Sequence, residues 1–141
     1  MIAAPLASTI VAIALIPVAF LFCHAFLTGR GKKRFHPVSG AAAIIWDLTV
    51  SIGYMLYRSL GGAIDDASLQ LTATLNVYFA IHIATAIIVM TLEIVVFVLG
   101  LITLKKKVFH NWHGKIATIL FFVWWFAFLS GEIFYIVMYL L

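Results

Sequence analysis

The sequence predicts an all-α integral membrane protein, a single domain whose four transmembrane helices form an antiparallel up-down bundle. Of its 141 residues, 65% are hydrophobic and 10% are charged, whereas a soluble domain is about half apolar and one quarter charged. Four apolar stretches are each long enough to cross a membrane, and helices are the spanning elements that such stretches form. The short connections between the stretches place successive helices side by side and antiparallel.

The predicted helices cover about residues 6–28, 38–60, 70–104 and 114–140. The first contains Pro17, where a bend is expected. The second begins after Pro37, because proline suits the first turn of a helix. The third is longer than a bilayer core of about 30 Å requires, so it is expected to tilt or protrude. The fourth is rich in phenylalanine and tryptophan, which favours packing and lipid contact.

The charges of the connections predict the orientation of the bundle. The first connection is basic through Arg30, Lys32, Lys33 and Arg34, and the third is basic through Lys105, Lys106, Lys107 and Lys115. The second connection is acidic through Asp65 and Asp66. Positive connections usually face the cytoplasm, which places both termini outside a multi-pass protein of the plasma membrane. No basic residue precedes the first apolar stretch, so we expect a retained helix rather than a secretory signal.

Several function classes are disfavoured by composition. The net charge of +4 lies in short connections rather than in a basic stripe, so nucleic acid is not an expected partner. Cys23 is the single cysteine and no C-x-x-C-H motif is present, which excludes an internal disulfide and covalent haem attachment. Neither G-x-S-x-G nor a glycine-rich phosphate loop occurs. We therefore expect no catalytic residues and no independent enzymatic activity.

Polar residues recur at matched spacings within the apolar helices. Steps of 11, 7 and 4 residues, which keep side chains on one helix face, separate His36, Asp47, Tyr54 and Arg58 in the second helix and His113, Trp124, Gly131 and Tyr135 in the fourth. In the third helix, His82 and Glu93 are also 11 residues apart. Polar faces of this kind should point into the bundle, since exposure to lipid is costly.

Two polar clusters follow from these faces. The inner one would combine His24, His36, His110 and His113 with Asp47 or Glu93, and the outer one His82, Glu132, Arg58, Tyr54 and Tyr78. Pairing of Arg58 with Glu132 would lower the cost of burying both charges.

Imidazoles on different helices are typical of b-type haem sites, and imidazole with carboxylate also suits zinc, copper or iron. The candidate ligands of haem or a metal ion are His36, His82 and His113, with His24 as a further haem contact. The alternative is that these histidines are hydrogen-bonded packing residues, or interfacial residues beside lipid phosphates.

The fourth helix resembles the closing pattern of a small four-helix membrane family, the domain of unknown function 420. The matching residues, in order and spacing, are His113, Lys115, Ile116, Ala117, Trp124, Ser130, Gly131, Tyr135 and Tyr139. His36 after a basic connection also matches, and Tyr78 with His82 matches loosely. The chain departs from the family at Arg58, where the family has a histidine.

Members of that family include cytochrome oxidase assembly proteins. The resemblance therefore implies a haem-associated accessory subunit or assembly factor of a terminal oxidase or related respiratory complex, with that complex and lipid as partners. Two alternatives stay open at this point. One is a purely structural transmembrane subunit of a larger complex, and the other is a b-type cytochrome subunit that passes electrons to or from quinone.

Overall fold

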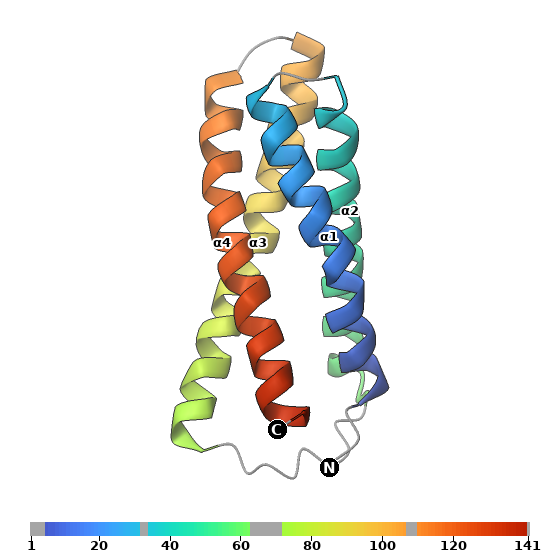
Figure 1. Ribbon diagram of the computed structural model, residues 1–141, viewed down its shortest axis with the longest axis vertical. Coiled ribbons are helices and arrows are strands. Elements are labelled where there is room, and N and C mark those ends of the chain that lie inside the picture. The colour runs from blue at the N-terminus through green and yellow to red at the C-terminus, as the bar shows by residue number, and fades with distance from the viewer. Residues whose placement is uncertain (1–4, 32–33, 63–71, 107–109, 141) are drawn as a thin grey trace.

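A computed structural model shows the chain as a bundle of four helices (Figure 1), and it describes residues 5–31, 34–62, 72–106 and 110–140. The helices are α1 (Leu6–Arg30), α2 (His36–Ser59), α3 (Ala73–Lys106) and α4 (His110–Tyr139). Each is long and apolar enough to cross a membrane. Within the described ranges there is no strand, so the all-helical prediction is confirmed.

The observed bounds refine the expected ones at the ends of the helices. α2 begins at His36 and α4 begins at His110. His36, His110 and His113, which were expected in or near connections, therefore lie in first helical turns. α1 continues through Pro17. α2 ends at Ser59, and Gly61 follows the C-cap residue Leu60. The φ of 87° at Gly61 lets the amides of Gly61 and Gly62 bond back to carbonyls of the last turn.

Parts of the predicted connections fall outside the described residues. These are Lys32, Lys33, Asp65, Asp66, Lys107 and the first two residues of the expected third helix.

The helices are arranged in chain order around the bundle axis. α1 packs against α2 and α4, and α3 packs against α4 and α2, so α2 and α4 lie across a diagonal. The last turns of α1 and α3 and the first turns of α2 and α4 lie at one end of the bundle, and the first turn of α1 and the last turn of α4 lie at the other (Figure 1). We call these the basic end, which carries Arg30, Arg34, Lys105, Lys106 and Lys115, and the terminal end.

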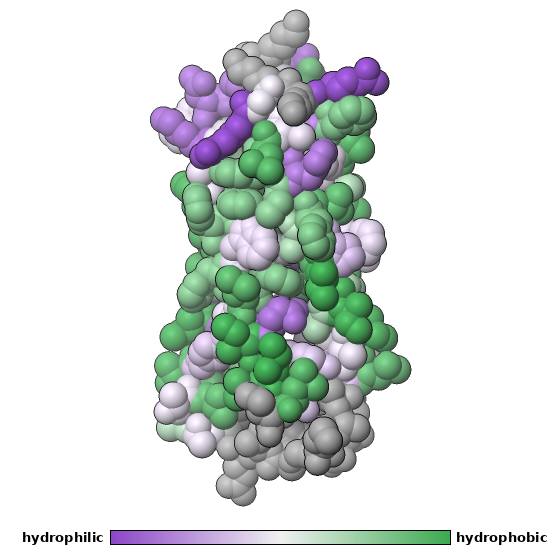
Figure 2. All heavy atoms as spheres, in the orientation of Figure 1, coloured by the Kyte–Doolittle hydropathy of each residue, from purple (hydrophilic) through white to green (hydrophobic). Residues whose placement is uncertain are grey.

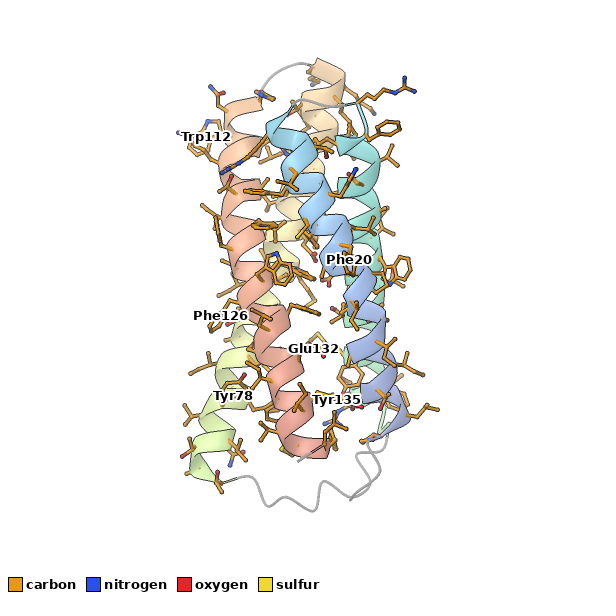
Figure 3. All side chains as sticks on the ribbon, in the orientation of Figure 1. Phe20, Tyr78, Trp112, Phe126, Glu132 and Tyr135 are labelled. Carbon is orange, nitrogen blue, oxygen red and sulfur yellow. The ribbon has the colours of Figure 1, made fainter. Side chains whose placement is uncertain are left out.

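The surface of the bundle suits a lipid environment along most of its length. Hydrophilic side chains gather at the basic end in Figure 2, and hydrophobic ones cover most of the visible face below it. Phe20 and Phe126 point away from the bundle in Figure 3, and Phe20 is 73% exposed. In water such a surface would be an association liability, whereas lipid solvates it.

Aromatic stacking fills the middle of the bundle. The Trp124 ring of α4 stacks on Phe22 of α1 at 4.6 Å between centroids and on Phe128 at 5.1 Å. Its indole Nε1–H donates to Oδ1 of Asp47 at 3.2 Å. Since Asp47 belongs to α2, this hydrogen bond crosses the diagonal and joins two helices that do not pack directly on each other.

We predict that Trp124→Phe lowers the thermal unfolding temperature of the purified protein, while Trp125→Phe leaves it nearly unchanged. Phenylalanine keeps a ring between Phe22 and Phe128 but leaves a buried Asp47 oxygen unpaired, which costs about 1–3 kcal/mol. The neighbouring Trp125 is half-buried and contacts the rings of Phe121, Trp124 and Phe128, contacts that a phenylalanine can also make, so it serves as the matched control. Equal losses in both variants would show that ring volume, rather than the hydrogen bond, matters.

Candidate functional site

A cavity of about 580 Å³ lies between the four helices at the basic end. Its size is typical of small-molecule and cofactor sites. Its ionisable lining consists of two arginines and three histidines, namely Arg30, Arg34, His36, His110 and His113. Four glycines also line it, Gly29, Gly40, Gly100 and Gly114. At the deep end, the buried side chains of Ile44, Val96 and Leu120 form the floor.

His36 is held against α1 by one hydrogen bond. Its Nδ1 lies 2.8 Å from the carbonyl oxygen of Ala25, and because a carbonyl only accepts, Nδ1 carries the proton. A side chain at Gly29 would place a Cβ 2.8 Å from the His36 ring, so the glycine is what allows this approach. The tautomer leaves the lone pair of Nε2 free, which is the arrangement of a metal-ligating histidine with an oriented ring.

His113 faces His36 from the opposite side of the bundle. The two ring centroids are 5.9 Å apart and the ring planes meet at 65°. Nδ1 of His113 is buried and has no hydrogen-bond partner among the described residues, although the backbone carbonyl of Val96 interacts with the ring more weakly. Gly100 leaves room for the ring, since a Cβ there would lie 3.3 Å from its Cε1.

The separation of these rings is close to that of two imidazoles on one ion. A ligating nitrogen lies about 2.0–2.1 Å from its metal, which puts the centroids of two opposed rings about 6.3 Å apart. Within the described residues no cluster of three histidine, cysteine or carboxylate side chains is arranged to hold a metal ion. The pair therefore suits an ion that brings most of its own ligands.

A layer of carboxyl groups lies one helical turn below the cavity floor. Asp47 lies three residues beyond Ile44 on α2, and Glu93 lies three residues before Val96 on α3. Trp124 lies four residues beyond Leu120 on α4. Glu93 is fully buried and Asp47 is 4% exposed. The two carboxyl groups interact electrostatically with each other, and neither oxygen of Glu93 has a hydrogen-bond partner in the described chain.

His82 belongs to a separate group of contacts toward the terminal end. Its Nδ1 lies 2.8 Å from Oγ of Ser130, and the Ser130 hydroxyl donates to the Ala127 carbonyl at 2.8 Å. The serine oxygen therefore accepts from Nδ1–H of His82. Tyr78 donates its hydroxyl to the Ser130 carbonyl at 2.7 Å. Ser130 is 17 residues beyond His113 on α4, about 25 Å along the helix, so His82 and His113 cannot ligate one ion.

The predicted ion pair between Arg58 and Glu132 is not formed. Both residues are described, and no salt bridge joins them; the Arg58 guanidinium instead lies 6.0 Å from the centre of the Tyr54 ring. Glu132 is half-buried on the side of α4 that faces α1 (Figure 3). The tyrosines near them bond to α1, Tyr54 to Ser8 at 3.1 Å and Tyr135 to Thr9 at 2.8 Å.

The structure thus sorts the predicted histidines into three groups. His36 and His113 meet in the cavity, with His110 exposed at its edge. His82 is a hydrogen-bonded packing residue, which was the alternative to a ligand in the sequence analysis. His24 is exposed and does not line the cavity, because its position on α1 faces away from α4.

Sequence reasoning missed two contacts at the middle of the bundle, the Trp124–Asp47 hydrogen bond and the Asp47–Glu93 pair. A signal for the first was present, since Asp47 follows His36 by 11 residues and Trp124 follows His113 by 11. Helices that begin at the same end place such residues at the same depth.

Comparison with known proteins found no matching family model, no matching curated protein and no matching solved structure. The resemblance of the fourth helix to the oxidase-assembly family stays a prediction.

We predict that Gly131→Ala destabilises the protein by about 1–3 kcal/mol through overpacking. A Cβ at Gly131 would lie 2.9 Å from Cε1 of His82, and the hydrogen bond to Ser130 limits how far that ring can retreat. Gly53→Ala is the control, because no atom lies within 4 Å of its Cβ and alanine favours a helix by about 0.5–1 kcal/mol. Denaturant unfolding in detergent measures both; a neutral Gly131→Ala would contradict the packing described for His82.

Proposed function

We propose that this protein binds a b-type haem between His36 and His113, and that it acts as an accessory subunit or assembly factor of a terminal oxidase or a related respiratory complex. The observation that carries the haem proposal is the pair of imidazoles from α2 and α4, with ring centroids 5.9 Å apart in a cavity lined by all four helices. Haem iron needs only one or two protein ligands, because the porphyrin supplies the other four.

The remaining cavity lining is compatible with haem. Phe22, Phe26, Phe97 and Phe121 contribute apolar and aromatic walls, which bury a flat hydrophobic group. Gly40 and Gly114 leave room between the helices near the two histidines, and no Cβ contact closer than 3.9 Å would arise at either.

The charges of the cavity suit the propionates of haem. Arg30 and Arg34 lie at the basic end of the lining, where charge-assisted hydrogen bonds to carboxylates would form near the membrane surface. Arg30 also lies over the Phe26 ring at 4.5 Å, which positions its guanidinium above the aromatic wall.

A bound haem would supply one-electron chemistry or serve as cargo for a partner complex. The protein's own residues would bind and orient it: Nδ1–H of His36 on the Ala25 carbonyl fixes the ring, and Ile44, Val96 and Leu120 form the floor on which the group would rest. The choice of an oxidase as partner rests on the resemblance of α4.

The proposed location is the plasma membrane, with the basic end in the cytoplasm and both termini outside. The basic residues of the first and third connections support this orientation. The exposed apolar faces of the helices would contact lipid and the larger complex.

We predict that the purified protein, titrated with haem b, develops a Soret absorption band that is lost or strongly shifted in His36→Ala and in His113→Ala. Either substitution removes one of the two imidazoles that face the cavity.

His82→Ala and His24→Ala are the matched controls, because His82 bonds to Ser130 far from the cavity and His24 is exposed. Both should keep the wild-type band. Equal binding by all four variants would contradict the proposed ligands. A colourless protein that purifies in fixed ratio with a larger complex would contradict the haem proposal and favour a structural subunit.

A further inference from the structure

The carboxyl layer below the cavity has a feature that packing does not explain. Glu93 is fully buried, and neither of its carboxyl oxygens has a hydrogen-bond partner among the described residues. The acid with which it interacts is Asp47. A buried unpartnered carboxylate is among the most costly groups a membrane bundle can contain. A protein tolerates the free-energy cost of burying such a carboxyl group where the group binds a proton or another ligand.

Among the described residues, no lysine or arginine interacts with the two acids. Asp47 of α2 interacts with Trp124 and Glu93, and Glu93 of α3 interacts with Asp47. From α4 the neighbour is Trp124, and from α1 it is the apolar Phe22, which stacks on Trp124. On α1, Cys23 and His24 follow Phe22, and Arg30 lies in the last turn. The titratable residues that line the cavity toward the basic end are Arg30, Arg34, His36, His110 and His113. Toward the terminal end, the next titratable residues on α2, α3 and α4 are Tyr54, His82 and Glu132.

We propose that Asp47 and Glu93 form a proton-binding site in the middle of the bundle, in which the two carboxyl groups share one proton that exchanges with water through the cavity at the basic end. Two adjacent ionised carboxylates repel each other strongly in a medium of low dielectric. One proton removes that repulsion and turns the contact into an O–H···O⁻ hydrogen bond, the short, charge-assisted kind.

The geometry assigns the proton to Glu93. The Trp124 N–H donates to Asp47, which stabilises the ionised form of that carboxyl group. Glu93 is the partner without a donor, so its protonated oxygen would donate to Asp47. The proton moves from water in the cavity onto a Glu93 oxygen, and on release it returns to water.

The cavity is the shorter route to this site. One layer of side chains, Ile44, Val96 and Leu120, separates the carboxyl groups from it. On the terminal side, His82 is the next described titratable residue of α3, 11 residues or about 16 Å away. Val89 fills the turn beside Glu93 on that side and is buried. The proposal does not depend on haem, so it stands or falls separately.

The test is infrared spectroscopy of the full-length protein in lipid nanodiscs at neutral pH. We expect a protonated-carboxyl C=O band that shifts in D₂O, disappears in Glu93→Gln and shifts in Asp47→Asn. Glu132→Gln controls for the other carboxyl group of the helices and should leave this band in place. If Glu93→Gln removes only ionised-carboxylate bands, or if the band follows Glu132, the shared proton is overturned. Sodium-dependent changes of the same carboxylate bands would also overturn it in favour of a metal cation.

The route is tested by two variants that delete the same atoms on the two sides of Glu93. Val96→Ala opens the layer toward the cavity, and Val89→Ala opens the layer toward the terminal end. Provided that both variants keep the carboxyl band, Val96→Ala should speed its hydrogen–deuterium exchange severalfold, with little change in Val89→Ala. Equal rates in the two variants, or a faster rate in Val89→Ala, would overturn access through the cavity.

Discussion

The hydrogen bond from Trp124 to Asp47 is the constraint on which the rest of the bundle depends. It joins α2 and α4 across the diagonal, in the middle of a core that, apart from Glu93, consists of apolar and aromatic side chains. Because an unpaired acceptor is costly there, the bond fixes how far α2 and α4 slide past each other. With that register set, His36 and His113, each 11 residues nearer the basic end, lie at the same level and face each other.

The two ends of the bundle differ in whether their polar side chains are paired by hydrogen bonds. At the terminal end, hydroxyl groups and His82 are satisfied by neighbours on the adjacent helix, as in Tyr78 with Ser130. At the basic end, four glycines leave space between the helices unfilled and a cavity remains, with the Nε2 of His36 and the buried Nδ1 of His113 beside it. Satisfied contacts hold a bundle together, whereas unsatisfied groups around a cavity indicate a ligand.

The sequence predicted the helices, their order and the meeting of His36 with His113, because apolar length and the steps of 11, 7 and 4 residues depend on helix geometry alone. It did not predict that His24 lies outside the cavity, since a single titratable residue on an apolar helix does not show which face of that helix points into the bundle. The Arg58–Glu132 pair failed because equal depth does not ensure contact between side chains. The Asp47–Glu93 pair joins neighbouring helices, and sequence spacing cannot give the rotation of one helix against another.

The central claim is that imidazoles from α2 and α4 converge on one site across the bundle. Electron paramagnetic resonance of the ferric haem complex, formed by the full-length protein in nanodiscs, tests it most directly. The account predicts a low-spin signal from iron with two imidazole ligands, converted to a high-spin signal when either His36 or His113 is replaced by alanine. A high-spin signal in the wild-type protein, or a low-spin signal that survives both substitutions, would contradict it.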